Sequence, residues 1–334
     1  GILAELGERV AAAAQAKRPL MIRGGGTRLF HGEPLPPEGS FDWLDMAPWR
    51  GIVDYEPSEL VLVARAGTPL AEVEQLVASR GQMLSFEPPR FGAAGTIGGC
   101  VAAGMTGPRR MAAGPLADFV LGARLFGPHG KVMRFGGEVM KNVAGYDVSR
   151  LLAGSLGILG PIVEVSIKVL PRPRREESVV LALDEAAALR QCVDWRSQAI
   201  PISATAWTAD DSGRSGQLVV RLSGNESAVR QSVAQIGGER LAPAEAEAFW
   251  DSLRDQTHAF FTQRPLWRVV LPPGVPSLQV GNELHEWQGC LRWLAGPQDA
   301  PALRERVGAL GGSASIQRGD ASTQGVPVFH PMAP

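Results

Sequence analysis

The stretch LMIRGGGTRLFHGEP, residues 20–34, raises the main question about this chain. An apolar run typical of a β-strand leads into Gly24, Gly25 and Gly26, and a loop rich in Pro and Gly follows. Three adjacent glycines are costly to order, because glycine loses more backbone freedom on folding than other residues. We therefore expect something to lie against this backbone that leaves no room for side chains.

Consecutive glycines let backbone N–H groups converge on an anion such as a pyrophosphate. The phosphate-binding motif G-x-x-x-x-G-K-[ST] is absent from the chain. A dinucleotide fingerprint would open a helix, but prolines follow this loop instead. The remaining arrangement is a tight turn between strands that clamps the pyrophosphate of a flavin dinucleotide, with a second glycine-rich segment nearby. GTIGG, residues 95–99, is such a segment, so the pair predicts an FAD site.

The composition indicates a folded chain of two ordinary domains: 334 residues, 45% hydrophobic and 20% charged. A net charge of −1 gives no sign of a nucleic-acid partner.

Cys100, Cys192 and Cys290 are few and far apart, which indicates a reducing compartment. It also excludes an iron–sulfur cluster built from this chain alone, since such clusters usually need about four thiolates. No apolar run approaches the roughly 20 residues that span a bilayer.

Hydrophobic patterns along the chain predict an α+β protein with largely antiparallel pairing. The N-terminus reads as an amphipathic helix rather than a signal peptide, and residues 92–114 read as backbone laid against a ligand. Near residue 175, PRPRREES marks a domain boundary. Strands are expected at 60–66, 161–171 (with one wet face), 178–183, 202–209, 216–224, 265–273, 284–296 and 313–319, with a hairpin at 127–130. Helices are expected at 68–81 (Thr68 as N-cap), 184–197 (N-cap Asp184), 225–236 (N-cap Asn225), 243–261 and 298–310.

Several stretches of the first half resemble the vanillyl-alcohol-oxidase type of FAD-binding domain, also called PCMH-type. They are IRGGGT, GQMLSFEPP, GTIGG, GPRR, DFVLGARL, FGGEVMKNVAGYDVSRLLAGSLG and EVSIKVLPRP. Together with PLWRVVLPP, EWQGCLRWL and GGSASIQRGD in the second half, they make nearly the whole chain similar to the FAD-binding E subunit of bacterial glycolate oxidase. KNVAGYDVSRL with GPRR is the most specific part of the resemblance.

The resemblance implies an α+β fold in which residues 1–174 form a two-lobed FAD-binding domain. Residues 175–334 would form an α+β cap domain with an antiparallel sheet, and further C-terminal sequence is expected beyond Pro334. Some relatives tether the flavin to His or Cys, but Thr27 follows the glycines here, which implies noncovalent FAD; His31 reads as a surface-loop residue. The implied FAD contacts are Arg23, Gly24, Gly25, Gly26, Thr27, Arg28, Pro88, Gly95, Thr96, Gly98, Gly99, Ala103, Gly104, Gly157 and Ile162.

Candidates for the chemistry are less specific. Arg109 and Arg110 suit planar anions, so they either face a reduced flavin or a carboxylate, or form structural ion pairs. Lys141 and Tyr146 lie in KNVAGYD and either face the flavin or support the loop. Arg110, Lys141 and Tyr146 are therefore only weak catalytic candidates. His285 in NELHEW has no companion in the sequence, so no metal site is predicted.

Two positions depart from the family pattern. Ile158 stands where Thr is expected, and Ser313 stands where His is expected. The second departure weakens any catalytic role for the strand that contains it.

The resemblance implies a flavoprotein subunit of a complex that oxidises glycolate, or a similar small 2-hydroxy acid, to the 2-oxo acid. The implied partners are a second FAD-containing catalytic subunit and an iron–sulfur subunit, with electrons passing to a quinone or respiratory acceptor. The expected location is the cytoplasm, with membrane contact only through the complex. Two alternatives stay open: an independent FAD-dependent 2-hydroxy-acid dehydrogenase, and a structural subunit with an empty flavin site. The intact RGGGT and GTIGG argue against the second.

Overall fold

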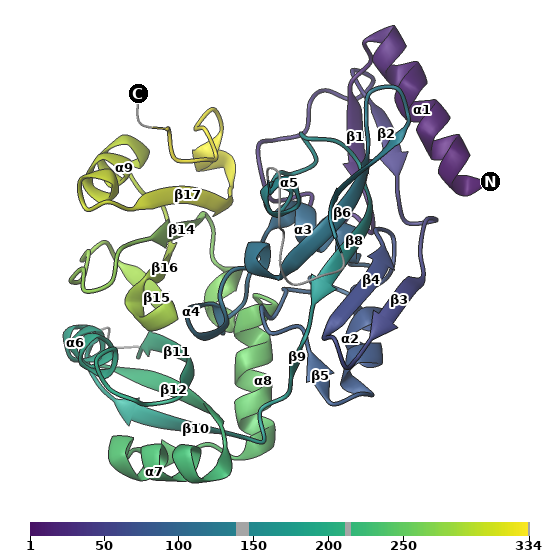
Figure 1. The fold of residues 1–334 in the computed structure, drawn as a ribbon. Helices are drawn as coiled ribbons and strands as arrows, with labels where there is room; N and C mark the ends of the chain where they lie inside the picture. Colours follow the sequence, from purple (N-terminus) through teal and green to yellow (C-terminus); the bar gives the residue numbers. More distant parts are fainter. Residues whose placement is uncertain (138–146, 211–214, 333–334) are drawn as a thin grey trace. The chain divides into compact units, whose positions relative to one another are not determined.

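The computed structural model describes residues 1–137, 147–210 and 215–332, and its contacts divide the chain into two units (Figure 1). The first unit comprises Gly1–Leu29, Pro34–Gly107 and Gly114–Arg172. The second comprises Phe30–Glu33, Pro108–Ala113 and Pro173–Pro334. Two short segments from the N-terminal half of the sequence therefore belong to the second unit.

The first unit contains two main sheets. Strands β1 and β2 pair in parallel, with Leu20 opposite Asp42, and a five-stranded antiparallel sheet has the order β3-β4-β8-β6-β7. The elements are α1 (Ile2–Ala16), β1 (Leu20–Arg23), β2 (Asp42–Asp45), β3 (Ile52–Glu56), β4 (Val61–Arg65), α2 (Leu70–Ala78), β5 (Gln82–Met83), α3 (Ile97–Ala103), β6 (Val120–Phe126), β7 (Val132–Gly136), α5 (Val148–Leu151), β8 (Ile162–Lys168) and β9 (Leu170–Pro171). These two sheets form the two lobes that the sequence predicts.

Strand β8 is antiparallel to both its neighbours, as predicted, but its expected wet face is wrong. Glu164 and Ser166 are buried along with the apolar residues, because β8 lies between β4 and β6 and contacts α3. The buried carboxylate of Glu164 forms an ion pair with the guanidinium of Arg124, with 3.1 Å between the nitrogen and the oxygen. Helix α1 is amphipathic as expected and packs Leu6 and Val10 into the core.

Two local expectations in the first unit need correction. Helix α2 has Pro69 rather than Thr68 at its N-cap; the Thr68 hydroxyl lies 2.7 Å from the Arg65 carbonyl oxygen and accepts from the Gly51 amide. The Gly- and Ala-rich segment 92–114 contains the short buried helix α3. Its N-cap is Thr96, whose hydroxyl accepts from the Gly99 amide at 3.3 Å.

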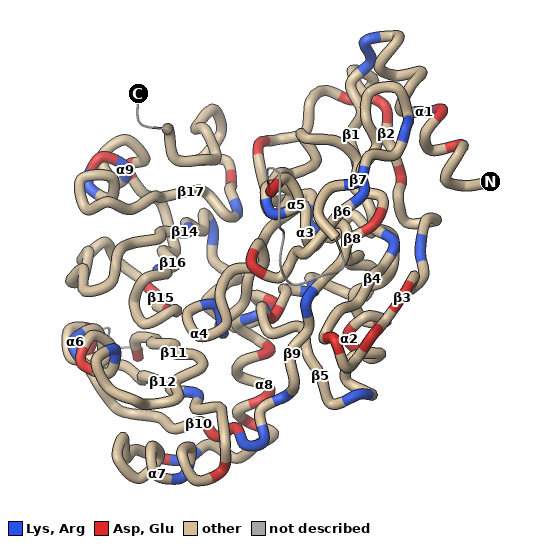
Figure 2. Tube along the Cα trace, in the orientation of Figure 1, with Lys and Arg blue, Asp and Glu red and all other residues tan. Residues whose placement is uncertain are grey.

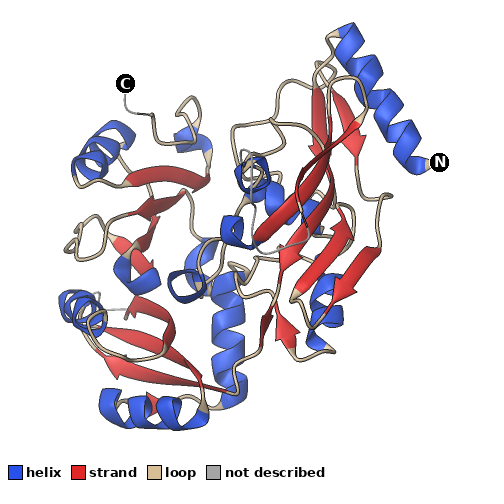
Figure 3. Cartoon of the chain, in the orientation of Figure 1, coloured by secondary structure: helices blue, strands red, loops and turns tan. Residues whose placement is uncertain are grey.

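The second unit is built on one eight-stranded sheet in the order β13-β10-β12-β11-β15-β16-β14-β17, with antiparallel neighbours throughout (Figure 3). Its elements are α4 (Arg110–Ala113), β10 (Arg175–Ala182), α6 (Glu185–Trp195), β11 (Ile202–Ala209), β12 (Gly216–Gly224), α7 (Glu226–Ile236), β13 (Glu239–Arg240), α8 (Pro243–Arg254), β14 (Leu266–Val270), β15 (Asn282–Glu286), β16 (Leu291–Ala295), α9 (Ala300–Ala309) and β17 (Ser313–Arg318). The α+β unit with an antiparallel sheet is thus confirmed.

The predicted strand 284–296 is wrong as a single element. It is two antiparallel strands, β15 and β16, joined by the turn Trp287–Gly289, whose three residues all have positive φ (54°, 56° and 79°). The predicted helix 243–261 is also too long, since α8 ends at Arg254 and a short 3-10 helix, Ala259–Thr262, follows. The predicted caps Asp184 and Asn225 are confirmed, and each accepts a hydrogen bond from the backbone three residues on.

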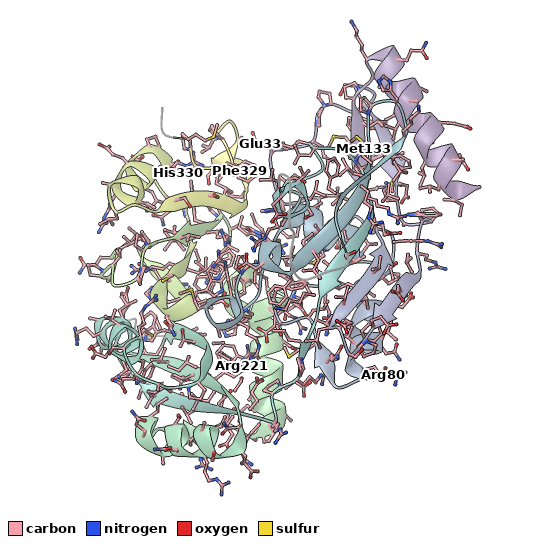
Figure 4. All side chains as sticks on the ribbon, in the orientation of Figure 1. Glu33, Arg80, Met133, Arg221, Phe329 and His330 are labelled. Atoms are coloured by element: carbon pink, nitrogen blue, oxygen red, sulfur yellow. The ribbon has the colours of Figure 1, made fainter. Side chains whose placement is uncertain are left out.

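Specific polar contacts hold the two short segments in the second unit. The Glu33 carboxylate accepts from the Val328 amide at 2.8 Å, and Figure 4 shows Glu33 beside Phe329 and His330. The Arg109 guanidinium donates to the Glu176 carboxylate at 2.5 Å and to the Ser223 hydroxyl at 3.1 Å. Lys and Arg are interspersed with Asp and Glu in both units (Figure 2).

The ion pair of Glu176 predicts a pH-dependent stability. Burial raises the pKa of Glu176, but the charges of Arg221 and Arg109 and the hydrogen bonds from Ser223 and Arg109 outweigh it and hold that pKa below its usual 4.5. The stabilisation is therefore complete above pH 4.5 and is lost as the pH falls through the lowered pKa. We expect Glu176→Gln to lower the urea midpoint at pH 7 but not in acid.

Urea unfolding from pH 7 down to pH 3 measures this difference. Glu226→Gln is the matched control, because its ion pairs are exposed and such pairs contribute little. Equal midpoints for wild type and Glu176→Gln at pH 7 would contradict the prediction.

Candidate functional site

A pocket lies within the first unit, at the glycine-rich loop that follows β1. Its walls come from the end of β1, the segments after β2 and β4, helix α3, and the chain leading into β8. The lining residues are Ile22, Arg23, Gly24, Met46, Ala66, Thr96, Gly98, Gly99, Ala102, Leu156, Gly157, Gly160 and Ile162. Apolar side chains and glycine backbone dominate this surface, as in many sites for organic cofactors.

The structure brings together about half of the predicted FAD contacts in this pocket. Those that line it are Arg23, Gly24, Thr96, Gly98, Gly99, Gly157 and Ile162. Gly25, Gly26, Thr27 and Arg28 continue the same loop, and Ala103 and Gly104 end helix α3. Pro88 is buried in the segment before Gly95. The Arg28 guanidinium donates a hydrogen bond to the Pro89 carbonyl oxygen in that segment.

Sequence reasoning missed Ile22, Met46, Ala66, Ala102, Leu156 and Gly160. The first of these, Ile22, adjoins a predicted contact on β1, and Leu156 and Gly160 flank Gly157, so their neighbours offered a signal. Met46 and Ala66 follow strands β2 and β4 and carry no local sign of a site. Only the folding of those strands beside β1 and β8 brings them to the pocket.

The protein itself gives the immediate reason for the adjacent glycines. A Cβ on Gly25 would lie 1.6 Å from the Ala94 carbonyl oxygen, and one on Gly24 would lie 2.2 Å from the Thr96 hydroxyl. A Cβ on Gly98 would likewise lie 2.6 Å from Cβ of Ala66. The two glycine-rich segments are therefore packed against other parts of the chain, and these contacts leave no room for side chains at the three positions.

The backbone amides of residues 24–28 are available to a ligand. None of them donates a hydrogen bond to any residue within 1–137, 147–210 or 215–332. By contrast, the amides at the start of α3 are already used: those of Ile97, Gly98 and Gly99 donate to the Thr68 carbonyl, the Ala66 carbonyl and the Thr96 hydroxyl. These residues are exposed or partly exposed, so their amides can donate to water or to a ligand. Consecutive amides in a glycine-rich turn favour an anion, so the loop 24–28 is the part of the site that fits one.

Two arginines add positive charge to this loop. Arg23 lies 3.4 Å from the Asp45 carboxylate and stacks on Trp43, so its charge is largely compensated. Arg28 donates to the Pro89 carbonyl oxygen and to the Thr27 hydroxyl, and it stacks on Phe91 at 5.6 Å. Within the described part of the chain it has no carboxylate partner, which favours a phosphate-like group nearby.

Apolar side chains are exposed beside the pocket. Ile158 is 86% exposed and Leu159 is 48% exposed, and both lie between the lining residues Gly157 and Gly160. Large exposed apolar side chains next to a pocket favour a ligand with an apolar part. The departure of Ile158 from the expected Thr therefore adds apolar surface here.

Of the three weak catalytic candidates, only Arg110 lies within the described residues, and it does not line the pocket. Lys141 and Tyr146 lie outside the described residues. Arg110 belongs to the second unit, and its neighbour Arg109 is taken up by the structural ion pair with Glu176. The two adjacent arginines, which the sequence treats alike, thus have different roles.

The expectation that His285 has no companion is wrong. Its Nε2 lies 2.9 Å from the Glu283 carboxylate and 3.4 Å from the Glu185 carboxylate, in the second unit. The fully buried Arg292 guanidinium lies close enough for both carboxylates to raise its pKa, although burial lowers that pKa overall. This positive charge makes the cluster an internal ion-pair network. The sequence could not show it, because Glu185 and His285 are a hundred residues apart.

Comparisons with known proteins agree with this site. Residues 3–136 match the family described as FAD binding domain. The chain is 42% identical over 310 residues to the glycolate oxidase subunit GlcE of Escherichia coli (strain K12), covering 92% of this chain and 85% of that protein. A solved structure of alkyldihydroxyacetonephosphate synthase superposes with a TM-score of 0.65 at 18% identity, covering 92% of this chain and 69% of that one.

Two further relatives match over about half of the chain. The chain is 28% identical over 189 residues to the glycolate oxidase subunit GlcD of Bacillus subtilis (strain 168), covering 57% of this chain and 40% of GlcD. It is 30% identical over 165 residues to a D-lactate dehydrogenase of Archaeoglobus fulgidus, covering 49% and 36%. The matched part of this chain therefore covers less than half of the length of either relative.

The domain match, the fold and the pocket define a flavoprotein: an FAD-binding subunit of an oxidoreductase with the vanillyl-alcohol-oxidase type of fold. Within that class the chain belongs to the family of the glycolate oxidase subunit GlcE. The recognition, the fold class and the cofactor predicted from the sequence are confirmed.

The glycine contacts predict unequal effects of two adjacent substitutions. Gly25→Ala forces its Cβ into the Ala94 carbonyl, so we expect it to displace the loop and weaken FAD binding about tenfold or more. Gly26 has positive φ, and a Cβ there would make only an ordinary contact at 3.8 Å with the Leu29 side chain, so Gly26→Ala introduces mainly backbone strain of about 1–2 kcal/mol. FAD titration of both variants measures the difference. Equal losses of affinity would show that packing against residues 94–96 does not shape the site.

Proposed function

We propose that the chain binds FAD noncovalently as one subunit of a complex that oxidises glycolate, or a similar small 2-hydroxy acid, to the 2-oxo acid. The observation that carries the proposal is the run of unpaired amides at residues 24–28 beside an apolar pocket. The similarity to the GlcE subunit supports glycolate as the substrate of the complex.

The chain's own residues would hold the cofactor in two ways. The amides of residues 24–28, with Arg28 beside them, would bind the pyrophosphate, since such converging amides favour an anion without needing a lysine. The pocket between β1, α3 and the chain before β8 would take the uncharged part and exclude water from it. Bound FAD supplies an acceptor for the two electrons of an alcohol oxidation.

Noncovalent binding is supported by the side chains around the pocket. Neither His nor Cys is among the lining residues in the described part of the chain. Cys100 is buried in α3, and burial raises the pKa of its thiol to about 11, which keeps it an unreactive thiol. His31 belongs to the second unit, where its ring meets Phe329 edge-on at 6.4 Å.

The rest of the electron pathway is assigned to partners. All three cysteines of the chain are buried and unpaired with one another, and an iron–sulfur cluster needs about four thiolates. We therefore propose a separate iron–sulfur subunit, together with a second flavoprotein subunit that carries the substrate chemistry. No described helix is long and apolar enough to cross a membrane, so contact with the inner face of a membrane is proposed only through the complex.

Anaerobic titration of the purified chain with FAD, followed by glycolate, tests this proposal. We expect the absorbance spectrum of a bound flavin. We also expect acid precipitation of the protein to release that flavin into solution. We expect glycolate to bleach that flavin only when the second flavoprotein subunit is present. Flavin that stays in the acid pellet would contradict noncovalent binding, and a chain that takes up no FAD would contradict the proposal as a whole.

A further inference from the structure

Two arginines of the second unit stack on the ring of Trp287. The Cζ atom of Arg110 lies 4.9 Å from the ring centroid, and that of Arg268 lies 5.2 Å from it. Arg110 begins helix α4, which packs against β11 and the turn Trp287–Gly289, and Arg268 lies in β14 (Figure 1). All three residues belong to the second unit, although Arg110 is distant from the others in sequence.

The turn holds Trp287 in an unfavourable backbone conformation. Trp287 and Gln288 both have positive φ, which is costly for residues with side chains, and Gly289 has φ of 79°. The Gln288 amide donates to the Thr205 hydroxyl at 2.8 Å, and a Cβ on Gly289 would lie 2.4 Å from the Leu189 side chain. Such strain survives where the surroundings fix the conformation, and it often marks a functional position. Here it fixes the ring between the arginines.

Within the described residues, the two guanidinium groups on this ring carry more positive charge than the acidic groups shown to act on them. Neither Arg110 nor Arg268 has a hydrogen bond or ion pair with a residue of the described ranges. Burial lowers the pKa of Arg268 to about 10, the charge of Arg110 lowers it further, and only the buried Glu286 opposes this. Glu286 also accepts from the Trp293 indole at 2.7 Å. Glu286 is the one acidic group of the described residues shown to act on Arg268, so the two guanidinium charges exceed this carboxylate charge by one.

The geometry suits a planar anion. A guanidinium that stacks on an indole uses its face, so the N–H groups around its edge stay available. Those edges match the two oxygens of a carboxylate in a bidentate hydrogen bond. The neighbouring Arg109 shows the contrast, because its edge is occupied by Glu176 and Ser223.

We propose that Arg110 and Arg268, held on Trp287, form a binding site for a small monocarboxylate of the 2-hydroxy-acid class or of its 2-oxo product. One unbalanced positive charge matches one carboxylate. The choice of a 2-hydroxy acid rests on the proposed function, whereas the anion site itself rests only on the contacts within the second unit.

Isothermal titration of the full chain with sodium glycolate tests the site, with neutral glycolamide as the control ligand. We expect saturable binding of glycolate and none of glycolamide. Arg110→Lys and Arg268→Lys keep the charge but lose the planar edge, so each should weaken binding about tenfold. The exposed Arg190→Lys is the matched control and should bind like wild type. Absence of saturable binding to the wild type, or equal affinity in all three variants, would overturn the proposal.

A second measurement needs no variant and therefore no assumption about folding. Phenylglyoxal modifies accessible guanidinium groups, and mass spectrometry identifies the modified residues. We expect glycolate to slow the modification of Arg110 and Arg268 in the wild-type chain while leaving that of Arg190 unchanged. Modification of all three at rates independent of glycolate would overturn the proposal.

The same samples separate this inference from the proposed function. FAD uptake is followed by absorbance before each glycolate titration. A chain that binds FAD but no glycolate refutes only the carboxylate site. A chain that binds glycolate at Arg110 and Arg268 but no FAD refutes the proposed flavoprotein function and leaves the anion site standing.

Discussion

A Cβ atom on Gly25 would lie 1.6 Å from the carbonyl oxygen of Ala94, and much of the first unit depends on that close approach. It lets the loop after β1 lie directly on the segment that begins helix α3. Thr96, which caps that helix, meets Gly24 in the same contact. Packing against residues 94–96 and the Arg28 side chain hold the loop, and the amides of residues 24–28 donate to no described residue, so they can bind a ligand.

Strand pairing in the same unit assembles one pocket from distant parts of the chain. Strand β1 pairs with β2, which brings Met46 to the pocket, and β4 pairs with β8, which brings Ala66 beside Gly98. The wall opposite these residues comes from Leu156 and Gly157, just before β8. A substitution that pushes the two glycine-rich segments apart therefore acts on the fold and on the cofactor site together.

The second unit shows how two neighbouring, chemically identical residues come to differ. Arg109 is neutralised by Glu176, which is itself fixed on β10. Arg110 points its guanidinium at Trp287, whose position is set by the left-handed turn between β15 and β16. Similarly, no second histidine stands near His285 in the sequence. The fold nevertheless places two carboxylates, from β15 and α6, against its Nε2.

Local sequence determined the elements whose signals are local. Asp184 and Asn225 cap α6 and α7 as their side chains predict, and the glycine pattern with its family resemblance identified the FAD-binding class. Tertiary structure decided what depends on neighbours far away in the chain. Strand-like residues flank Trp287–Gly289 on both sides and the turn itself begins with a Trp, so the packing of β15 and β16 shows where the chain turns. The alternation of β8 predicts its pairing but not its burial, because a strand covers its polar face only when a helix and an arginine meet it there. Tertiary structure also decides which charged side chains form ion pairs. An ion pair depends on the distance between two groups in space, whereas the sequence gives only their separation along the chain.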